Sequence, residues 1–128
     1  MGYYVDTINF WYDDDPDHLP AIERNPENLL LKVNNYRKAS HLITHEEYLY
    51  KEGKLLFYYL LQGEEGNIWE TRIYFYSKGI MFKSIVKANG KELTAKDLTT
   101  PEYLDFKPNS RNIQKKGKEY QELFIKSM

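Results

Sequence analysis

The chain has 128 residues, no cysteine and a net charge of only −1 at pH 7. This is the length of one domain, and the lack of Cys excludes both a disulfide framework and a thiolate metal site. Hydrophobic residues make up 41% and charged residues 29%, as in folded globular proteins. No apolar run approaches the roughly 18 residues of a membrane span. We therefore expect one domain over residues 1–128, cytoplasmic and without a membrane partner.

The first third of the chain predicts a strand, an acidic loop and a helix. Residues 3–11 are β-branched and aromatic, which favours a strand, and the acidic stretch around Pro16 ends it. Asn25-Pro26-Glu27 has the residue types of a helix start. Apolar residues then recur at helical spacing and predict a helix over about 26–38: Leu29, Leu30, Val33 and Tyr36.

Residues 44–52 fit two structures. Thr44 and Glu47 form a capping box, which favours a short helix that ends at Gly53. Tyr48 and Tyr50 alternate before the turn, which suits a hairpin instead. We favour the helix and leave the hairpin open.

The centre of the chain predicts consecutive strands. Residues 55–62 are apolar on both faces, as in a central strand covered on both sides, and 68–76, 80–88 and 91–94 follow after turns. Asn89-Gly90 is a strong hairpin signal because both residues accept positive φ. The alternation predicts these core residues: Trp69, Ile73, Phe75, Ile80, Phe82 and Val86. On this prediction Phe82→Ala would cost about 3–5 kcal/mol.

The last third predicts one more helix. Thr100-Pro101-Glu102 opens a helical turn at most, 107–112 is a loop, and 112–126 carries an apolar stripe. The fold class expected is therefore α+β. A curved antiparallel meander of four or five strands should pack against an N-proximal helix and a C-terminal helix.

The sequence contains no complete pattern for catalysis or metal binding. His41 and His45 are four residues apart but lack the HExxH context, so we expect both at the surface. Asp13–His18 lacks EF-hand spacing and is interpreted as a solvated acidic loop. Nucleophile elbows and phosphate-binding glycine loops are missing from the sequence. We expect no catalytic residue, no metal site and no cofactor.

A basic stretch near the C-terminus could bind phosphates in principle. It contains five cations within twelve residues: Lys107, Arg111, Lys115, Lys116 and Lys118. No nucleic-acid-binding motif accompanies them, and the whole chain is nearly neutral. We expect a solvated helix face and no nucleic-acid binding at physiological salt.

Tyrosine is unusually frequent, with 12 Tyr and two Trp residues. Tyr and Arg supply many interface hot spots. The alternation places Arg72, Tyr74 and Tyr76 on the outward side of one strand, with Lys83 on the next. These four residues are the predicted partner-binding site, although cross-strand pairing that stabilises the sheet could also use them.

The function hypothesis is a non-enzymatic interaction module that binds a partner protein stoichiometrically, in an accessory, inhibitor or immunity role. A homodimer is left open. The alternative is a small-molecule-binding cone, the shape of cystatin-like and NTF2-like α+β domains, with at most a weak enzymatic role. A partner binder should have a filled core and an aromatic outer patch. A pocket protein should enclose a cavity.

Overall fold

Within the described residues, seven antiparallel strands form one sheet in which every strand pairs with its neighbours in sequence. The computed structural model describes residues 4–13, 26–64 and 66–127. The strands are β1 (Tyr4–Tyr12), β2 (Leu30–Ala39), β3 (Leu42–Lys51), β4 (Lys54–Glu64), β5 (Asn67–Phe75), β6 (Met81–Ala88) and β7 (Lys91–Glu92). The sheet is thus larger than the four or five strands expected, and the two unexpected strands are β2 and β3.

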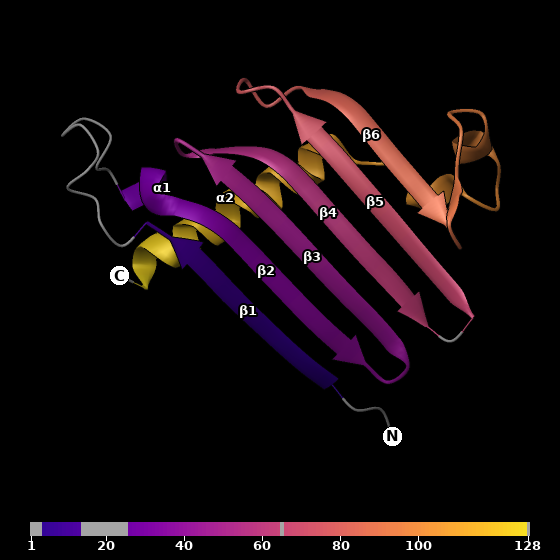
Figure 1. Cartoon of the computed structure of the whole chain (residues 1–128), viewed down its shortest axis with the longest axis horizontal. Coiled ribbons are helices and arrows are strands. Elements are labelled where there is room, and N and C mark those ends of the chain that lie inside the picture. Colours follow the sequence, from indigo (N-terminus) through magenta and orange to yellow (C-terminus); the bar gives the residue numbers. More distant parts are fainter. Residues whose placement is uncertain (1–3, 14–25, 65, 128) are drawn as a thin grey trace.

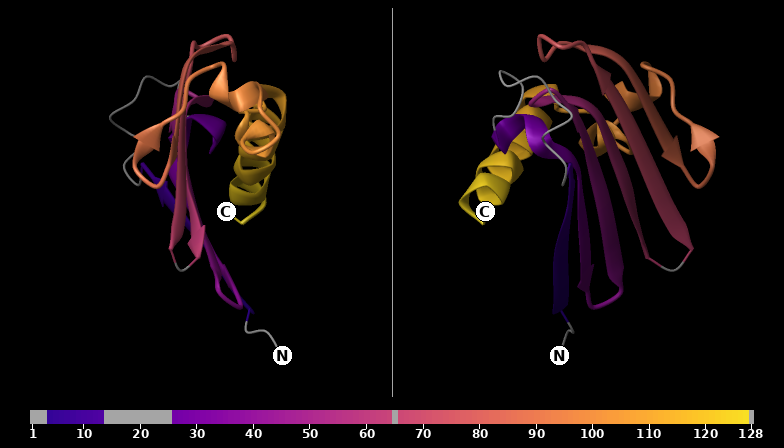
Figure 2. Two further views of the ribbon diagram at one scale, coloured as in Figure 1. Left: turned by 90° about the vertical axis from the view of Figure 1, so that its right-hand side faces the viewer. Right: turned by 60° about the vertical axis from the view of Figure 1, so that its left-hand side comes forward.

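The helices are few, and one of them dominates. A single turn, α1 (Pro26–Leu29), precedes β2, and two 3-10 turns, η3 (Asp97–Thr99) and η4 (Leu104–Phe106), follow β7. The long helix α2 (Ser110–Lys126) crosses behind the strands in Figure 1, and Figure 2 shows it on one side of the sheet. None of the helices in the described residues has the length and apolarity needed to cross a bilayer.

The two faces of the sheet are therefore different. We call the face against α2 the covered face. The opposite face carries no described helix or strand, and we call it the open face (Figures 1 and 2). The prediction that residues 55–62 are covered on both sides is wrong, because β4 packs under α2 on one face only.

The predicted N-proximal helix over 26–38 is wrong. Only the four residues of α1 are helical, and β2 begins at Leu30. The helical spacing has another cause: β2 has an extra residue, Leu31, between the pairs Trp11↔Lys32 and Tyr12↔Leu30. A bulge of this kind puts residues three apart on one face of a strand. Leu30 and Val33 are both fully buried for this reason.

The preferred helix over 44–52 is also wrong, and the hairpin alternative is confirmed. Residues 42–51 form β3, which turns into β4 at Glu52 and Gly53, both with positive φ. Thr44 and Glu46 are buried on the covered face, so the capping-box residues are strand residues in the structure. Tertiary burial has overridden the local signal.

Three bulges lie at the same end of the sheet. Besides Leu31, Leu56 is the extra residue between Leu49↔Phe57 and Tyr50↔Leu55, and Phe82 is the extra residue between Tyr74↔Lys83 and Phe75↔Met81. We call this end the bulged end. Bulges redirect side chains and strengthen the local twist.

The main core lies between α2 and the covered face. Ile113 and Phe124 of α2 pack there against strand residues, the most deeply buried being Tyr48, Leu30, Ile73 and Val33. A second cluster forms where Trp69, Val86 and Leu93 meet the segment around Phe106. The predicted core positions Ile73, Phe75 and Val86 are buried, and Trp69 is half-buried.

Two predicted core residues are not in the core. Ile80 lies in the turn before β6, and its side chain is exposed. Phe82 is the bulge residue of β6 and is 51% exposed. The bulge changes the phase of the alternation, so counting back from Val86 in steps of two gives the wrong face for Phe82.

The predicted C-terminal helix is confirmed and begins slightly earlier than expected. The Asn109 side chain caps it by accepting a hydrogen bond from the Asn112 amide at 3.1 Å. Gly117 allows the helix to approach the sheet, because a Cβ there would lie 2.8 Å from the Leu55 side chain. The Tyr50 hydroxyl donates to the Gly117 carbonyl at 2.6 Å. The one glycine of the helix is thus its point of closest contact.

Candidate protein-interaction face

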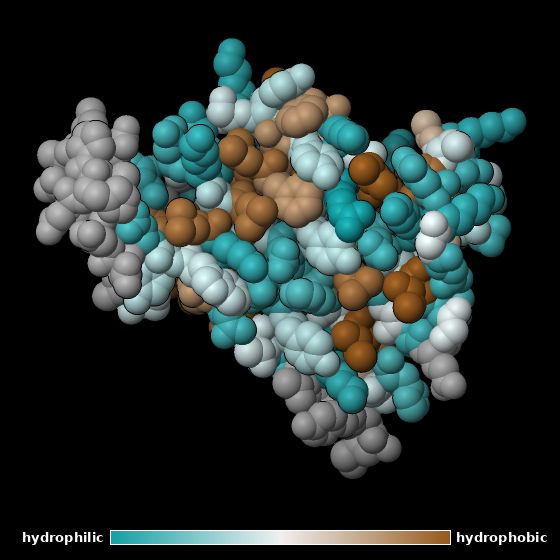
Figure 3. Space-filling model, in the orientation of Figure 1, coloured by the Kyte–Doolittle hydropathy of each residue, from teal (hydrophilic) through white to brown (hydrophobic). Residues whose placement is uncertain are grey.

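Hydrophobic side chains gather on the open face at the bulged end. Figure 3 shows this face with a hydrophobic area over those strand ends, a smaller one toward the opposite ends, and hydrophilic side chains between them. Several large hydrophobic side chains are exposed here, although folded proteins normally bury such residues. Among them are Trp11, Leu31, Leu49, Tyr76 and Phe82. Contiguous patches of this kind mark interaction surfaces more often than isolated exposed residues do.

One transverse row of residues organises this patch. The strand register places six side chains side by side across six strands: Trp11, Lys32, Leu49, Phe57, Tyr74 and Lys83. We call this set the aromatic row. The Lys32 ammonium lies 4.7 Å from the Trp11 ring, and the Lys83 ammonium lies 5.6 Å from the Tyr74 ring. The row therefore has aromatic and aliphatic surface at its centre and a lysine near each end.

The bulge of β6 adds a second layer of aromatic surface. The ring centroids of Tyr76 and Phe82 lie 4.4 Å apart, and the rings of Tyr74 and Phe82 lie 6.2 Å apart. Tyr74 also contacts Phe57 at 5.0 Å. Four rings from three strands and the turn after β5 thus form one continuous group. Aromatic rings in contact limit one another's rotation, so these four side chains restrict one another.

Next to the aromatic row, two cations of the open face form ion pairs. Arg72 lies 3.7 Å from the Glu70 carboxylate and 5.1 Å from the Tyr59 ring, and the Tyr59 hydroxyl donates to Glu70 at 3.4 Å. Burial and the Glu70 carboxylate raise the pKa of Tyr59. Lys32 pairs with Glu47 at 3.5 Å. This part of the face carries both signs of charge in alternation.

The four residues predicted as a partner-binding site share this face. Tyr74 and Lys83 are direct cross-strand neighbours, Arg72 is two residues back along β5, and Tyr76 is exposed just beyond the strand. Period-two alternation in β5 was a sufficient signal for three of them. Sequence reasoning missed four further residues of this patch: Trp11, Leu49, Phe57 and Phe82. Their positions depend on strand pairings that were not predicted or were only left open, and on the bulge in β6.

The covered face holds a buried polar cluster that sequence reasoning missed. Glu46 is only 2% exposed, and its carboxylate accepts hydrogen bonds from the Tyr58 hydroxyl at 2.5 Å, the Tyr48 hydroxyl at 3.1 Å and Arg37 Nη2 at 3.0 Å. Three donors thus converge on this one buried carboxylate. Burial, followed by the charge of Glu46, raises the pKa of both Tyr48 and Tyr58.

This cluster also fixes the position of α2. The Asn35 side-chain amide donates to the Tyr120 hydroxyl at 2.6 Å, and the Tyr120 ring lies 5.0 Å from the Tyr48 ring. The helix therefore meets the sheet through specific polar contacts as well as apolar packing. The Glu46 carboxylate and the tyrosine hydroxyls bond within the protein, whereas Asn35 Oδ1 and Arg37 Nε are buried with no hydrogen-bond partner among the described residues. The cluster is best explained as a structural element of the interface between α2 and the sheet.

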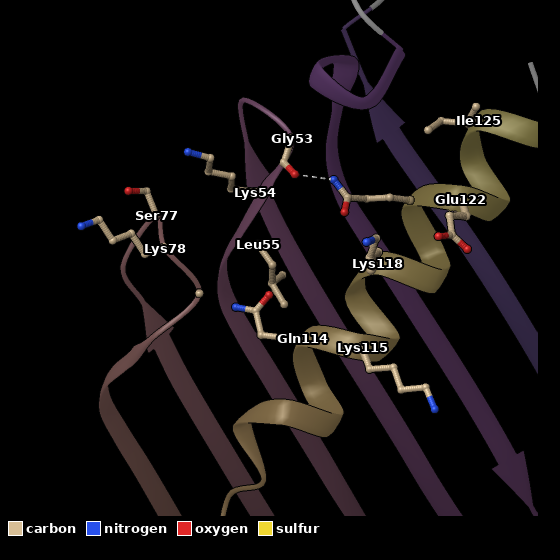
Figure 4. A pocket seen from close by; sticks show the side chains of 12 residues that line it. Gly53, Lys54, Leu55, Ser77, Lys78, Gln114, Lys115, Lys118, Glu122 and Ile125 are labelled. Carbon is tan, nitrogen blue, oxygen red and sulfur yellow. Dashed lines mark hydrogen bonds between the residues drawn. The ribbon is translucent and has the colours of Figure 1, made fainter.

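A cavity of about 700 Å³ opens at the bulged end between α2 and the β3–β4 and β5–β6 turns. Figure 4 shows the two turns on one side and the helix on the other, with the Gln121 side chain donating to the Gly53 carbonyl at 2.7 Å. The charged residues that line it are Lys54, Lys78, Lys115, Lys118 and Glu122. The four lysines are exposed, so their charges are well solvated.

The helix divides the basic segment of the sequence. Lys115 and Lys118 line the cavity just described, whereas Lys116 lies on the opposite flank of α2, in a cleft with Arg37 and Glu46. The five cations therefore do not form one phosphate-binding stripe. The prediction that they bind no nucleic acid stays a prediction.

The other candidate sites are separated by the fold. His41 lies in the β2–β3 turn and is exposed, and His45 is half-buried on β3 at 4.0 Å from Glu47. Within the described ranges, no group of three His, Asp or Glu side chains could hold a metal ion. Of the acidic loop predicted over Asp13–His18, only Asp13 is among the described residues. The rest lies outside them.

Comparison with known proteins gives no relative. The chain matches no family model, no curated protein and no solved structure.

Proposed function

We propose that this protein is a non-enzymatic interaction module that binds a partner protein stoichiometrically through the aromatic row and the neighbouring Tyr76–Phe82 pair. The observation that supports the proposal most strongly is the ordered aromatic group at the bulged end, exposed on a face that no described element covers. Buried Tyr and Trp anchors contribute about 2 kcal/mol or more each to many complexes.

The charges favour a protein partner over a nucleic acid. The cations Lys32 and Arg72 are paired with Glu47 and Glu70, which lowers the positive potential that phosphate backbones require. A protein surface with an apolar centre and mixed charges at its rim would match this arrangement. An inhibitor or accessory role is one form of such binding.

The filled core supports this proposal over the small-molecule alternative. A cone-shaped binding domain would have its cavity between the helix and the sheet. Here that space is occupied by side chains that are almost completely buried, including Tyr48, Leu30 and Ile73. The cavity of about 700 Å³ lies at the margin of α2, and another of about 380 Å³ lies away from the helix, beside Ile43, Leu61 and Ile68.

The test is the double variant Tyr74→Ala with Tyr76→Ala, compared with the matched variant Ile43→Ala with Ile68→Ala at the opposite end of the open face. Each immobilised protein is incubated with extract of the source cells, and bound proteins are quantified. We expect the tyrosine variant to lose a stoichiometric partner that the isoleucine variant keeps, with little change in Tm. Equal capture by both variants would refute the proposal, as would a large fall in the Tm of the tyrosine variant.

A further inference from the structure

The strand β1 forms one edge of the sheet, and within the described part of the chain nothing pairs with its outer side. From Tyr4↔Ala39 to Trp11↔Lys32 its ladder with β2 is uninterrupted, so the strand itself is regular. Its nine residues include one charge, Asp6, and no Lys, Pro or Gly. A long, regular edge with so little charge is an open template for another strand.

The opposite edge of the sheet is protected. The end of β6 pairs with β7 at Lys87 and Ala88, and the Leu93 amide donates to the Val86 carbonyl just beyond. The exposed remainder of β6 has a bulge at Phe82 and a lysine at position 83. Lysines, bulges and covering segments are the usual devices against edge-to-edge pairing. The difference between the two edges points to β1 as the one that pairs.

We propose that β1 pairs antiparallel with β1 of a second copy of this chain, about a twofold axis perpendicular to the sheet. This axis makes β1 of each copy the neighbour of β1 of the other copy. It also places the two covered faces on the same side of the combined sheet. Paired residues of the two copies must point to the same face and exchange backbone hydrogen bonds. The axis must therefore lie between the two copies of one residue and not between two peptide bonds. Ile8 is the middle residue of the strand, and centring there pairs all nine residues.

The side chains of β1 suit this arrangement. On the covered face Ile8 is 36% exposed although it lies beside buried Asn35, so the first strand is incompletely covered by its own helix. A second copy would bring its own Ile8 into contact there. On the open face Thr7 would lie opposite Asn9 of the copy, a polar pair. On the covered face Asp6 would lie opposite Phe10 of the copy, so the Asp6 carboxylates of the two copies do not face each other.

The first test measures mass in solution by sedimentation equilibrium. We expect the wild type to have twice the 15.3 kDa mass of the chain and Ile8→Lys to have the mass of one chain, with its circular dichroism unchanged. The control is Ile68→Lys, which changes another exposed isoleucine, one that lies away from the edge. This variant should remain dimeric. A wild type of single-chain mass up to its highest soluble concentration would overturn the proposal. So would an Ile8→Lys variant that stays dimeric.

The second test uses the lack of cysteine in the chain, and it remains informative if Ile8→Lys fails to fold. In the Ile8→Cys variant the two sulfurs would lie opposite each other at the axis, within disulfide reach. We expect mild oxidation to link this variant rapidly into covalent dimers and Leu104→Cys, which is exposed far from β1, only slowly. Equal rates for the two variants would contradict pairing through β1.

Discussion

The two faces of the sheet use the same residue types and obtain different results from them. On the covered face, Tyr48 and Tyr58 donate hydrogen bonds to Glu46, and all three side chains are buried. On the open face, Tyr59 donates to Glu70 at a longer distance, and both are half-exposed. The chemistry is that of tyrosine and glutamate in each case. The difference is the helix, which removes water from one cluster only.

This comparison shows why composition cannot locate the function of a tyrosine-rich chain. A buried tyrosine that bonds to a carboxylate specifies how a helix docks, whereas an exposed one near a cation is accessible to other molecules. Both environments are present here, on opposite sides of a sheet one strand layer thick. The following changes test whether the two faces differ as strongly in energy as they do in structure.

The largest contrast should come from the two glutamates. Glu46→Ala leaves two buried hydroxyls and Arg37 without their acceptor, so we expect the free energy of unfolding to fall by about 3–5 kcal/mol. Glu70→Ala removes only partly exposed contacts and should cost about 1 kcal/mol or less. Urea unfolding of both variants measures this. Similar losses would show that the polar clusters are equivalent.

Apolar truncation should separate the faces almost as clearly. Ile73 is 1% exposed beneath α2, so Ile73→Ala should cost about 2–5 kcal/mol through lost burial and a cavity. Ile68, on the same strand, is 51% exposed, and Ile68→Ala should change stability by about 0.5 kcal/mol at most. The midpoints of urea unfolding give the comparison. A loss below about 1 kcal/mol for Ile73→Ala would mean that α2 does not pack as described.

Alkaline pH should weaken the covered face selectively. The pKa of Tyr48 and that of Tyr58 are raised in the folded protein, so above about pH 10 the unfolded chain loses these protons while the folded protein keeps them. Stability is therefore fully present below pH 10 and falls as the pH rises further, by about 1.4 kcal/mol per pH unit for each such tyrosine. Tyr48→Phe should reduce that slope by about 1.4 kcal/mol per pH unit, which is the contribution of one tyrosine proton. The check is unfolding in urea between pH 9 and pH 11, and an unchanged slope would count against the buried cluster.

Phe82→Ala should cost far less than its sequence pattern suggests. The sequence alone predicts a core residue and a cost of about 3–5 kcal/mol. Because the side chain is 51% exposed and contacts only the open-face rings, we expect about 1 kcal/mol or less. Chemical denaturation decides between the two values. A loss above about 3 kcal/mol would restore Phe82 to the core and contradict the bulge in β6.

Much of the fold was predictable where local and tertiary signals agree. The strand at the N-terminus, the meander from residue 55 onward, the Asn89-Gly90 turn and the last helix all follow from periodicity and turn chemistry. Two of the errors have the same physical source. At Leu30–Val33 and around Phe82 a bulge shifts the alternation by one residue, and in the first case the result imitates a helix.

The candidate site was predictable only in part. Arg72 and Tyr74 lie on β5 and Tyr76 lies just beyond its end, so alternation alone places all three on the open face. Trp11 and Phe57 join them only through the register of six strands, which depends on the hairpins β2–β3 and β3–β4. A single sequence does not determine that register when a capping box competes with the hairpin at residues 44–52.

The order of the elements along the chain also has a consequence for synthesis. Each strand pairs with the next, so the sheet can grow hairpin by hairpin as the ribosome releases the chain, without waiting for distant segments. Helix α2, in contrast, follows all seven strands, and until residues 110–126 emerge the apolar side of the nascent sheet faces water. In that interval Tyr48, Ile73 and Phe75 are available to chaperones or to other nascent chains. When α2 docks, it covers these side chains and ends their exposure.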